Sequence, residues 1–201
     1  MLKYEKEALA NGYHQIAGVD EAGRGPLAGP VVAAAVFFPT ISQIPGIKDS
    51  KKLSPHKREN LFGLIYAEAK AVGLGKVDQD EIDRINIGQA SLKAMQLAVL
   101  SLKHRVDCLL IDGIYPLPMS IHQKVIKKGD NQSISIAAAS IIAKVVRDKI
   151  MIDYHQKYPH YNFAKHKGYG TREHREAIKK FGPCQIHRKT FKGVREYLVL
   201  S

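Results

Sequence analysis

Ile16-Ala17-Gly18-Val19-Asp20-Glu21-Ala22-Gly23-Arg24-Gly25-Pro26 joins an apolar run to two adjacent carboxylates and a glycine-rich loop. The apolar run predicts a buried strand that ends at Asp20. Carboxylates at the end of such a strand are costly unless a cation or hydrogen-bond donors meet them. Glycines on both sides of Arg24 allow the backbone to approach a ligand closely. This stretch alone leaves two interpretations open: a hairpin turn with solvated acids, or a functional site.

Further apolar runs predict the rest of a sheet. The run at 31–38 is stopped by Pro39, and the loop before it suits a strand antiparallel to the first. The other predicted strands cover 72–77, 106–112 and 121–126. The predicted helices cover 55–69 (capped by Ser54), about 80–102, 133–157 and 171–180, after a short amphipathic segment at 3–13. This order predicts an α/β fold in which helices cover a sheet.

The length and the charge of the chain constrain its class. With 201 residues it can form one domain with a sizeable core. We place a boundary near residue 158, between a core at 1–158 and a basic helical region at 159–201 that belongs to the same structural unit. The 31 Lys and Arg against 19 Asp and Glu give a net charge of +12, which predicts a polyanionic partner such as nucleic acid.

The cysteines and the apolar runs argue against several classes of protein. Cys108 and Cys184 form no CxxC pair, which argues against a disulfide framework and against a structural zinc site. The charged N-terminus lacks the apolar segment of a signal peptide, and no apolar run approaches the roughly 18 residues of a membrane span. We therefore expect a cytoplasmic protein without membrane contact.

Carboxylates recur at the ends of predicted elements. Asp112 ends a predicted strand and Asp130 precedes the long helix, so both can join Asp20 and Glu21. An oxygen-only set from separate elements suits hard divalent cations, and two such ions can activate water and stabilise the leaving oxygen of a phosphodiester. Because neighbouring side chains of a strand point to opposite faces, Asp20 and Glu21 share a site only where the strand ends or bulges. The turn at Ala22-Gly23 predicts such an end.

Basic and aromatic residues could hold a polyanion. The segment Ser50-Lys51-Lys52 stands before a predicted helix N-terminus, where phosphate binds readily. Arg24 is set in glycines, and Tyr169 lies between two glycines, where its ring can stack on a base or a sugar. The C-terminal part adds further basic side chains: Lys165, His166, Lys167, Arg172, Arg175, Arg188, Lys189 and Lys192. Each charge alone is typical of a solvated surface, but the group favours a nucleic-acid interface.

The nine histidines show no pattern of a catalytic or metal-binding set. Five of them fall in the last third of the chain: His155, His160, His166, His174 and His187. No pair has the spacing of a zinc clamp, and nothing in their setting favours a histidine-based ribonuclease. We expect surface or structural roles for them.

Several longer motifs occur together, in one order. They are Asp20-Glu21-Ala22-Gly23-Arg24-Gly25-Pro26-Leu27-Ala28-Gly29-Pro30, Asp49-Ser50-Lys51-Lys52-Leu53, Ile111-Asp112-Gly113, Lys128-Gly129-Asp130, the alanine-rich 135–144, His166-Lys167-Gly168-Tyr169-Gly170-Thr171 and His187-Arg188-Lys189-Thr190-Phe191. In this combination, over almost the whole chain, the sequence resembles bacterial type 2 ribonuclease H, ribonuclease HII. Only Lys189-Thr190 departs mildly from the family's usual Arg-Ser. The resemblance implies a ribonuclease H-like fold: a five-stranded mixed sheet flanked by helices, with a helical C-terminal region.

The resemblance also implies an activity, cofactors and partners. It implies an Mg²⁺- or Mn²⁺-dependent endonuclease that uses two metal ions. Such an enzyme cleaves the RNA strand of RNA–DNA hybrids and single ribonucleotides embedded in duplex DNA, and it leaves 5′-phosphate and 3′-hydroxyl ends. These duplexes are the expected partners. We expect a monomer. Docking on a replication clamp stays an open alternative that no feature of the sequence supports.

Individual roles follow from the positions that match the family's motifs. The resemblance makes the acidic set the catalytic and metal-binding residues: Asp20, Glu21, Asp112 and Asp130. It assigns Gly23, Arg24 and Gly25 to the ribose 2′-hydroxyl and the adjacent phosphate, and Tyr169 to the neighbouring deoxyribose. Further predicted substrate contacts are Ser50, Lys51, Lys52, Lys167 and Arg188.

Two alternatives remain at this point. A non-catalytic nucleic-acid-binding module would use the basic charge and Tyr169 equally well, but an intact acidic set would only repel its phosphates. A junction resolvase of the same superfold would share the acids but would not need Gly23-Arg24-Gly25.

Overall fold

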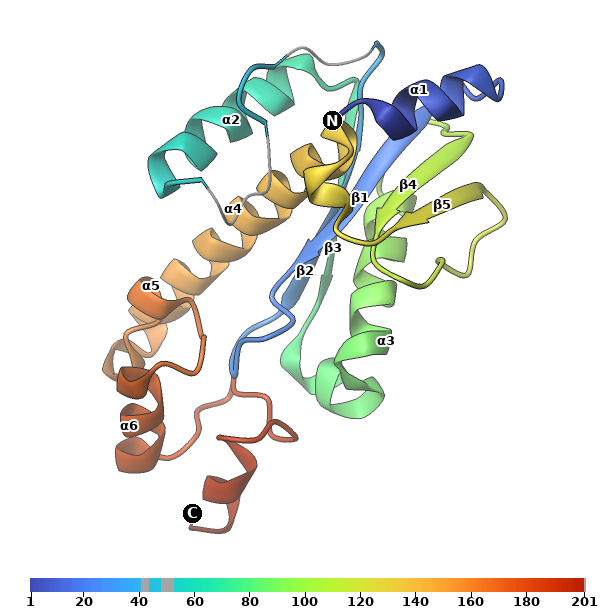
Figure 1. Ribbon diagram of the computed structural model, residues 1–201. Helices are drawn as coiled ribbons and strands as arrows, with labels where there is room; N and C mark the ends of the chain where they lie inside the picture. Colours follow the sequence, from blue (N-terminus) through green and yellow to red (C-terminus); the bar gives the residue numbers. More distant parts are fainter. Residues whose placement is uncertain (41–43, 48–52, 201) are drawn as a thin grey trace.

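The computed structural model describes residues 1–40, 44–47 and 53–200 (Figure 1). The predicted substrate contacts Ser50, Lys51 and Lys52 lie outside these residues. Within the described ranges, no helix combines the length and the apolar character that crossing a bilayer requires.

Five strands form one mixed sheet in the order β3-β2-β1-β4-β5. They are β1 (Ile16–Ala22), β2 (Val31–Phe37), β3 (Ala71–Val77), β4 (Cys108–Asp112) and β5 (His122–Ile126). Strand β2 pairs antiparallel with both β1 and β3, whereas β4 and β5 continue the sheet in parallel from the other side of β1. The predicted α/β fold with a five-stranded mixed sheet is confirmed.

The central strand β1 brings two acids to one edge of the sheet. Its register with β4 pairs Val19 with Ile111, so the next residues along the two parallel strands are Asp20 and Asp112. Carboxyl ends of parallel strands meet at the same edge, and open α/β sheets bind ligands outside such ends. The topology therefore turns two acids that are distant in sequence into neighbours.

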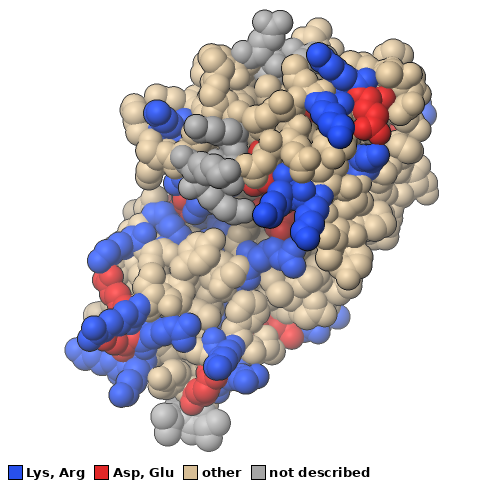
Figure 2. Space-filling view, in the orientation of Figure 1, with Lys and Arg blue, Asp and Glu red and all other residues tan. Residues whose placement is uncertain are grey.

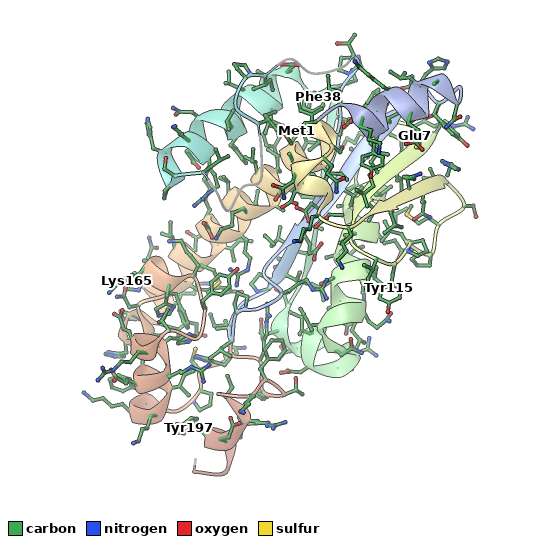
Figure 3. The ribbon with its side chains drawn as sticks, in the orientation of Figure 1. Met1, Glu7, Phe38, Tyr115, Lys165 and Tyr197 are labelled. Atoms are coloured by element: carbon green, nitrogen blue, oxygen red, sulfur yellow. The ribbon has the colours of Figure 1, made fainter. Side chains whose placement is uncertain are left out.

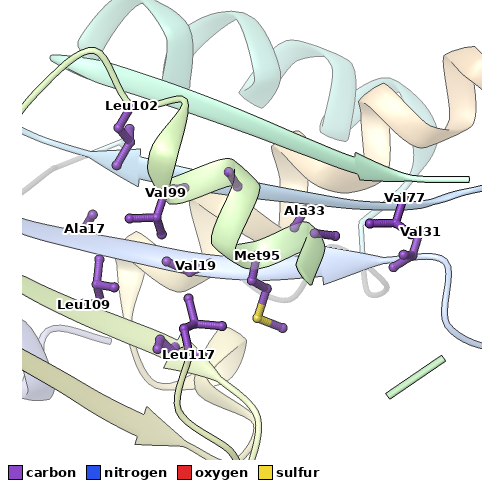
Figure 4. Close-up of a cluster of buried hydrophobic side chains, with 14 of the residues drawn as sticks. Ala17, Val19, Val31, Ala33, Val77, Met95, Val99, Leu102, Leu109 and Leu117 are labelled. Atoms are coloured by element: carbon purple, nitrogen blue, oxygen red, sulfur yellow. The ribbon is translucent and has the colours of Figure 1, made fainter. Parts of the chain in front are cut away.

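Two long helices cover the two faces of the sheet. Helix α3 (Gln79–Leu100) packs on one face, where alternate strand residues such as Val19 and Ala33 join it in an apolar core (Figure 4). Helix α4 (Ile134–Lys157) packs on the opposite face. Gly18 permits the close approach of α4, because a Cβ atom there would lie 2.1 Å from the carbonyl carbon of Ser135.

The remaining N-terminal helices lie outside these layers. Helix α2 (Pro55–Glu68) packs on α4, and its N-cap Ser54 accepts a hydrogen bond from Lys57 N at 3.3 Å, as the Ser-Pro pair predicts. Helix α1 (Lys3–Ala10) is shorter than the segment predicted at 3–13.

Helix α3 contains a break that the sequence does not predict. Asn86 has φ 67° and ψ 162°, which no helical residue adopts. Its Oδ1 accepts a hydrogen bond from Gln89 N at 3.1 Å, the pattern of an N-cap. Asn86 therefore restarts the helix after the kink, and the second part of α3 lies along the sheet.

The C-terminal region packs on the end of α4 and on the loop between β1 and β2. Its elements are η3 (Pro159–Tyr161), α5 (Phe163–His166), α6 (Arg172–Phe181) and η4 (Arg195–Leu200). Leu27 and Ala28 of the loop share an apolar cluster with Met151, Phe163 and Ile178. The loop that follows the acids is thus held by residues from the far end of the chain.

Candidate active site

Three elements place the predicted acidic residues along one edge of the sheet. Asp20 and Asp112 stand at adjacent strand ends, and Asp130 lies in the turn η2 (Gly129–Asn131) that follows β5. Asp112 Oδ1 accepts a hydrogen bond from Gly129 N at 2.7 Å, which ties the end of β4 to this turn. Asp130 is only 3% exposed, and its Oδ1 accepts a hydrogen bond from the Asn131 side-chain amide at 2.9 Å. We call these three residues and Glu21 the acidic edge.

Burial and mutual repulsion disfavour the charged forms of two of these acids. Burial raises the pKa of Asp20 well above its usual 3.8, and the charges of Glu21 and Asp112 raise it further. A hydrogen bond from Ser140 of α4 opposes this rise, as does the bond that Asp20 Oδ1 accepts from Glu21 N at 2.7 Å. Burial also raises the pKa of Glu21, against the opposing charge of Arg24.

The strand does not end between Asp20 and Glu21, so the prediction of a break there is wrong. Pairing with β2 continues without a bulge through Glu21↔Ala33 and Ala22↔Val32, because the hairpin partner runs on beside β1. The two side chains therefore start toward opposite faces. On the other side of β1 the ladder with β4 ends at Val19, and both acids feel the charge of Asp112. The open β4 side, rather than a turn, gives them a common neighbour.

The acidic edge suits a hard cation in its chemistry. Its potential ligands are all oxygen atoms, the preference of Mg²⁺ and Mn²⁺. Glu21 Oε2 is buried and has no hydrogen-bond partner in the described structure, and Arg24 approaches the other oxygen, Oε1, only to 3.4 Å. In the described part of the chain, no three acidic, histidine or cysteine side chains are already gathered closely enough to enclose a metal ion. The acids fit the ion by type, and binding would draw them together against their repulsion.

A buried arginine of α4 shapes the loop that follows the acidic edge. Arg147 donates hydrogen bonds to the carbonyl oxygens of Ala28 (3.1 Å), Pro30 (2.9 Å) and Lys167 (3.0 Å). Gly23 has φ +103°, and a Cβ atom there would lie 2.2 Å from Arg147 Nε. The loop therefore wraps around this guanidinium, which is 1% exposed.

Sequence reasoning missed Arg147, although a signal existed. Arg147 lies four residues from both Ala143 and Met151, and residues four apart share one face of a helix. Both neighbours are completely buried. An arginine in line with two apolar residues on a sheet-covering helix indicates a buried cation that needs several acceptors.

Arg188 contradicts the prediction of a direct substrate contact. Its side chain is completely buried and donates to the carbonyl oxygens of Gly23 (2.6 Å), Arg24 (3.0 Å), Pro26 (2.8 Å) and Gly29 (2.9 Å). Burial, followed by the nearby charge of Arg147, lowers its pKa to about 9. Because its donors are aimed into the loop, Arg188 supports the loop instead of meeting a ligand. We call Arg147 and Arg188 the arginine scaffold.

The structure brings Tyr169 beside the glycine-rich loop. Its ring carbon Cε1 lies 3.6 Å from where a Cβ atom of Gly25 would stand, and the residue is 44% exposed. A hydrogen bond from Leu27 N to Gly168 O, 2.8 Å long, joins the two segments directly. The side chain of Arg24 is 56% exposed, so it can reach a ligand at this place.

A basic groove of about 760 Å³ extends from Tyr169 between α2, α4 and α5. Its cationic lining residues are Arg58, Lys144, Lys149, Lys165 and Lys167. Some are already paired: Lys149 with Glu59 at 2.7 Å and Lys144 with Asp148 at 2.6 Å. Lys167 is half-buried and donates to the carbonyl of Ala164. The groove keeps an excess of positive charge, which suits a phosphate backbone.

The wider surface is basic as well. Figure 2 shows Lys and Arg side chains spread over this face, with small acidic areas bordered by them near its middle. Lys165 lies on the outer side of α5 (Figure 3), where it pairs with Glu173 at 2.9 Å. Arg172 also pairs with an acid, Glu176, at 2.7 Å, so part of the predicted basic surface is neutralised within the protein.

Comparison with known proteins gives a consistent result. The family model for ribonuclease HII matches residues 17–194. Ribonuclease HII of Geobacter metallireducens is 60% identical over 195 residues, which cover 97% of this chain and 92% of the relative. Ribonuclease HII of Geotalea uraniireducens is 60% identical over 198 residues, with 98% and 92% coverage.

Solved structures share the fold. Ribonuclease H2 from Pyrococcus horikoshii OT3 superimposes with a TM-score of 0.77 and 29% identity, covering 91% of this chain and 96% of that one. The ribonuclease HII of the PCNA complex from Archaeoglobus fulgidus gives a TM-score of 0.77 and 26% identity, with 89% and 95% coverage. Family model, relatives and fold agree, and the chain therefore belongs to the ribonuclease HII family of endoribonucleases, with the ribonuclease H fold.

Proposed function

We propose that this ribonuclease H cleaves the RNA strand of RNA–DNA hybrids and also cuts at single ribonucleotides embedded in duplex DNA, in both cases with divalent cations. One observation carries the proposal: the acidic edge continues directly into the loop Gly23-Arg24-Gly25, and Tyr169 stands beside that loop. Groups for hydrolysis and groups for sugar recognition are therefore adjacent. A junction resolvase would need only the first set.

The acidic edge would hold the cations, through Asp20, Glu21, Asp112 and Asp130. Two bound Mg²⁺ or Mn²⁺ ions would supply the activation of water and the stabilisation of charge on the leaving oxygen, which gives 5′-phosphate and 3′-hydroxyl ends. The protein's own groups orient the ligands: Ser140 bonds to Asp20, Gly129 N to Asp112 and the Asn131 amide to Asp130. Such outer partners commonly fix the direction of a metal ligand.

The loop would recognise the ribose. The 2′-hydroxyl distinguishes RNA from DNA at a single position, and a protein must come close to contact it. The carbonyl oxygens of Gly23 and Arg24 already accept bonds from Arg188, yet each carbonyl has a second lone pair that can accept from a hydroxyl. Arg24 would hold the adjacent phosphate, Tyr169 would pack on the next deoxyribose, and Lys167 in the basic groove would face the following phosphates.

A cleavage assay tests the proposal. The substrates are a full RNA–DNA hybrid and a DNA duplex with one ribonucleotide, each incubated with Mg²⁺, Mn²⁺ or EDTA, and the product ends are identified. We expect cleavage of both substrates with either metal, none with EDTA, and 3′-hydroxyl ends. A 2′,3′-cyclic phosphate, or cleavage that survives EDTA, would contradict the metal-dependent mechanism. Binding without cleavage under every condition would favour the non-catalytic module.

Recognition at the junction is tested by Tyr169→Ala. We expect a loss of about 10-fold or more on the single-ribonucleotide duplex, because base or sugar stacking is worth about 1–3 kcal/mol. The full hybrid should lose less. Tyr66→Ala on the exposed side of α2 is the matched control, since Tyr66 is similarly exposed at 42%. Equal ratios of the two activities in Tyr169→Ala and in the wild type would refute the recognition role.

We also propose that the protein is a cytoplasmic monomer that folds as one structural unit. Both cysteines are free, and burial raises the pKa of the Cys108 thiol to about 11, which suits an unreactive core residue. The shared apolar cluster of Leu27, Ala28 and the C-terminal helices supports a single unit. Light scattering of the purified chain measures its mass directly, and a dimer mass would refute the monomer.

A further inference from the structure

Three buried histidines lie directly behind Tyr169. His166 ends α5, His174 lies in the first turns of α6, and His187 follows that helix. Their exposed fractions are 8%, 0% and 1%. The rings of His166 and His174 stack, with centroids 4.4 Å apart. The proposed function uses none of these imidazoles, so their burial needs another explanation.

The hydrogen-bond partners of His187 and His174 favour one arrangement of protons. His187 Nδ1 contacts Cys184 N at 2.9 Å, Cys184 Sγ at 3.1 Å and Cys184 O at 3.3 Å. The shortest of these partners is a backbone N–H, which only donates, so we assign Nδ1 as an acceptor and place the proton of a neutral ring on Nε2. His187 Nε2 is 3.0 Å from His174 Nε2, which must then accept. His174 Nδ1 carries the remaining proton and donates to the carbonyl oxygen of Tyr169 at 2.9 Å. Every bond in this chain has one donor and one acceptor.

His166 follows the same logic beside the chain. Gly168 N donates to its Nδ1 at 3.2 Å, so Nε2 carries the proton and donates to the carbonyl of Tyr161 at 2.6 Å. A second proton on any of the three rings would place a donor against a donor. The backbone amides and carbonyls around the rings thus require neutral imidazoles.

The chain of bonds connects Tyr169 to the glycine-rich loop. At one end it holds the Tyr169 carbonyl, which also accepts from Thr171 N at 2.8 Å. At the other end, the residues on both sides of His187 pair with the loop: Gly29 N donates to Ile186 O at 2.8 Å and Arg188 N to Leu27 O at 2.9 Å. The two imidazoles therefore lie in one hydrogen-bonded path between the Tyr169 carbonyl and the loop that contains Leu27 and Gly29.

We propose that His174 and His187 are positioning residues that hold Tyr169 at its place beside the glycine-rich loop through this directed chain of hydrogen bonds. The proposal rests on the proposed function, because it assigns a purpose to the placement of Tyr169. We call the two residues the histidine relay.

The surroundings of the relay support neutral rings. Burial lowers the pKa of His174 to about 4 and that of His187 to about 3. The titratable and charged groups that face them are His166, Arg175, Tyr161 and Cys184, with Lys165, Lys167 and Glu173 facing His166. Apart from Glu173, which faces only His166, these groups carry no negative charge at neutral pH that could stabilise an imidazolium. Phe163 packs against both relay rings and excludes water.

The first test determines the tautomer and the charge of each relay histidine in the wild-type enzyme. Nitrogen-15 NMR of histidine side chains at pH 7 distinguishes the two tautomers and the charged form. We expect the Nδ1-protonated tautomer at His174 and the Nε2-protonated tautomer at His187. A charged ring, or the reverse pair of tautomers, would overturn the proposal without any variant having to fold.

The second test separates placement from folding. His174→Asn keeps an amide donor near the position of Nδ1, whereas His174→Leu removes it. We expect His174→Leu to lose about 10-fold in kcat/KM on the single-ribonucleotide duplex, because one hydrogen bond contributes about 0.5–1.5 kcal/mol, and much less on the full hybrid. His174→Asn should recover most of the loss, and His160→Leu on the exposed surface is the control.

The outcomes distinguish the two proposals. An unchanged ratio of the two activities in a folded His174→Leu enzyme, together with a changed ratio in Tyr169→Ala, would overturn the relay and leave the recognition role of Tyr169 intact. An unchanged ratio in Tyr169→Ala would overturn the recognition role, whatever tautomers the NMR spectrum shows.

Discussion

The acidic edge and the arginine scaffold both contain buried charged groups, and they differ in whether those groups have hydrogen-bond partners within the protein. In the acidic edge, burial and neighbouring carboxylates raise the pKa of Asp20 and Glu21, and Glu21 Oε2 has no partner in the described structure. In the scaffold, Arg147 and Arg188 point their donors at backbone carbonyls of one loop. Buried polar groups are normally paired. A buried carboxylate oxygen without a partner, beside other acids, suits a cation, whereas a guanidinium with all its partners in one loop fixes the geometry of that loop.

The largest effect should come from the acidic edge. Asp20→Asn keeps the shape of the side chain but removes a charge that a cation needs. We expect kcat to fall by about 10³-fold or more, the upper range for the loss of one electrostatic group, with hybrid binding largely retained. Asp153→Asn on the exposed side of α4 is the control. Near-normal turnover in Asp20→Asn would remove the distinction between the two regions.

The scaffold should show its effect in stability first. Arg188→Met leaves several buried loop carbonyls without a donor, and each costs about 1–3 kcal/mol. We expect the free energy of unfolding to fall by about 3–5 kcal/mol in urea titrations. Arg172→Met, whose parent side chain is 93% exposed, should change it by less than about 0.5 kcal/mol. Similar values for the two variants would mean that the loop does not depend on its buried cation.

A substitution at Gly18 tests how closely α4 packs on β1, the contact that places Ser140 beside Asp20. An added Cβ atom would meet backbone atoms of Ser135 and Ile136 at 2.1–2.4 Å, so α4 must move away from β1. We expect Gly18→Ala to cost about 2–3 kcal/mol of stability, since overpacking typically costs 1–3 kcal/mol. Gly63→Ala in α2 has open space around it and should be neutral or slightly stabilising. Equal stabilities would show that the sheet and α4 adjust freely.

The smallest effect is the contribution of the histidine relay to the pH dependence of the protein's unfolding free energy. Unfolded histidines take up protons near pH 6.5, whereas His174 and His187 in the folded protein have pKa values of about 4 and 3. The unfolded state binds more protons between these limits, so stability that is present above pH 6.5 is lost as the pH falls toward 4. We expect the double variant His174→Asn/His187→Asn to lose at least about 1 kcal/mol less than the wild type between pH 6.5 and 5. If the unfolding free energies of the variant and the wild type fall in parallel between pH 6.5 and 5, the low pKa values of the relay histidines are contradicted.

The elements of the fold could be predicted where local sequence decides them. Apolar runs mark the strands β1, β2 and β4, and the Ser54-Pro55 pair marks the start of α2. The boundaries of elements that are set by contacts distant in sequence could not be predicted. Strand β4 begins at Cys108 rather than at residue 106, and the Asp107 carboxylate accepts bonds from the backbone of His14 and Gln15 at 3.0 and 2.9 Å. A contact across such a sequence separation leaves no local pattern.

The candidate site divides in the same way. The acids at strand ends could be predicted as site residues, because a carboxylate that follows an apolar run is costly to bury without a partner. The role of Arg188 could not be predicted, since an arginine in a basic tail resembles any exposed cation. Only its contacts with the loop carbonyls reveal its burial. The relay histidines are similar. Their spacing fits no metal site, and their pairing depends on how α6 packs against Phe163.

The distance along the chain between the loop and its scaffold has a consequence for protein synthesis. Arg188 bonds to Gly23, which the ribosome adds 165 residues earlier. A nascent chain can therefore expose both Asp20 and Asp112 while the carbonyls of the loop still lack their donor. Residues up to Arg188 must leave the ribosome before the loop can take its final shape. If the loop recognises ribose as proposed, it acquires the shape for that task only after Arg188 has been added, whereas Asp20 and Asp112 precede Arg188 in the chain.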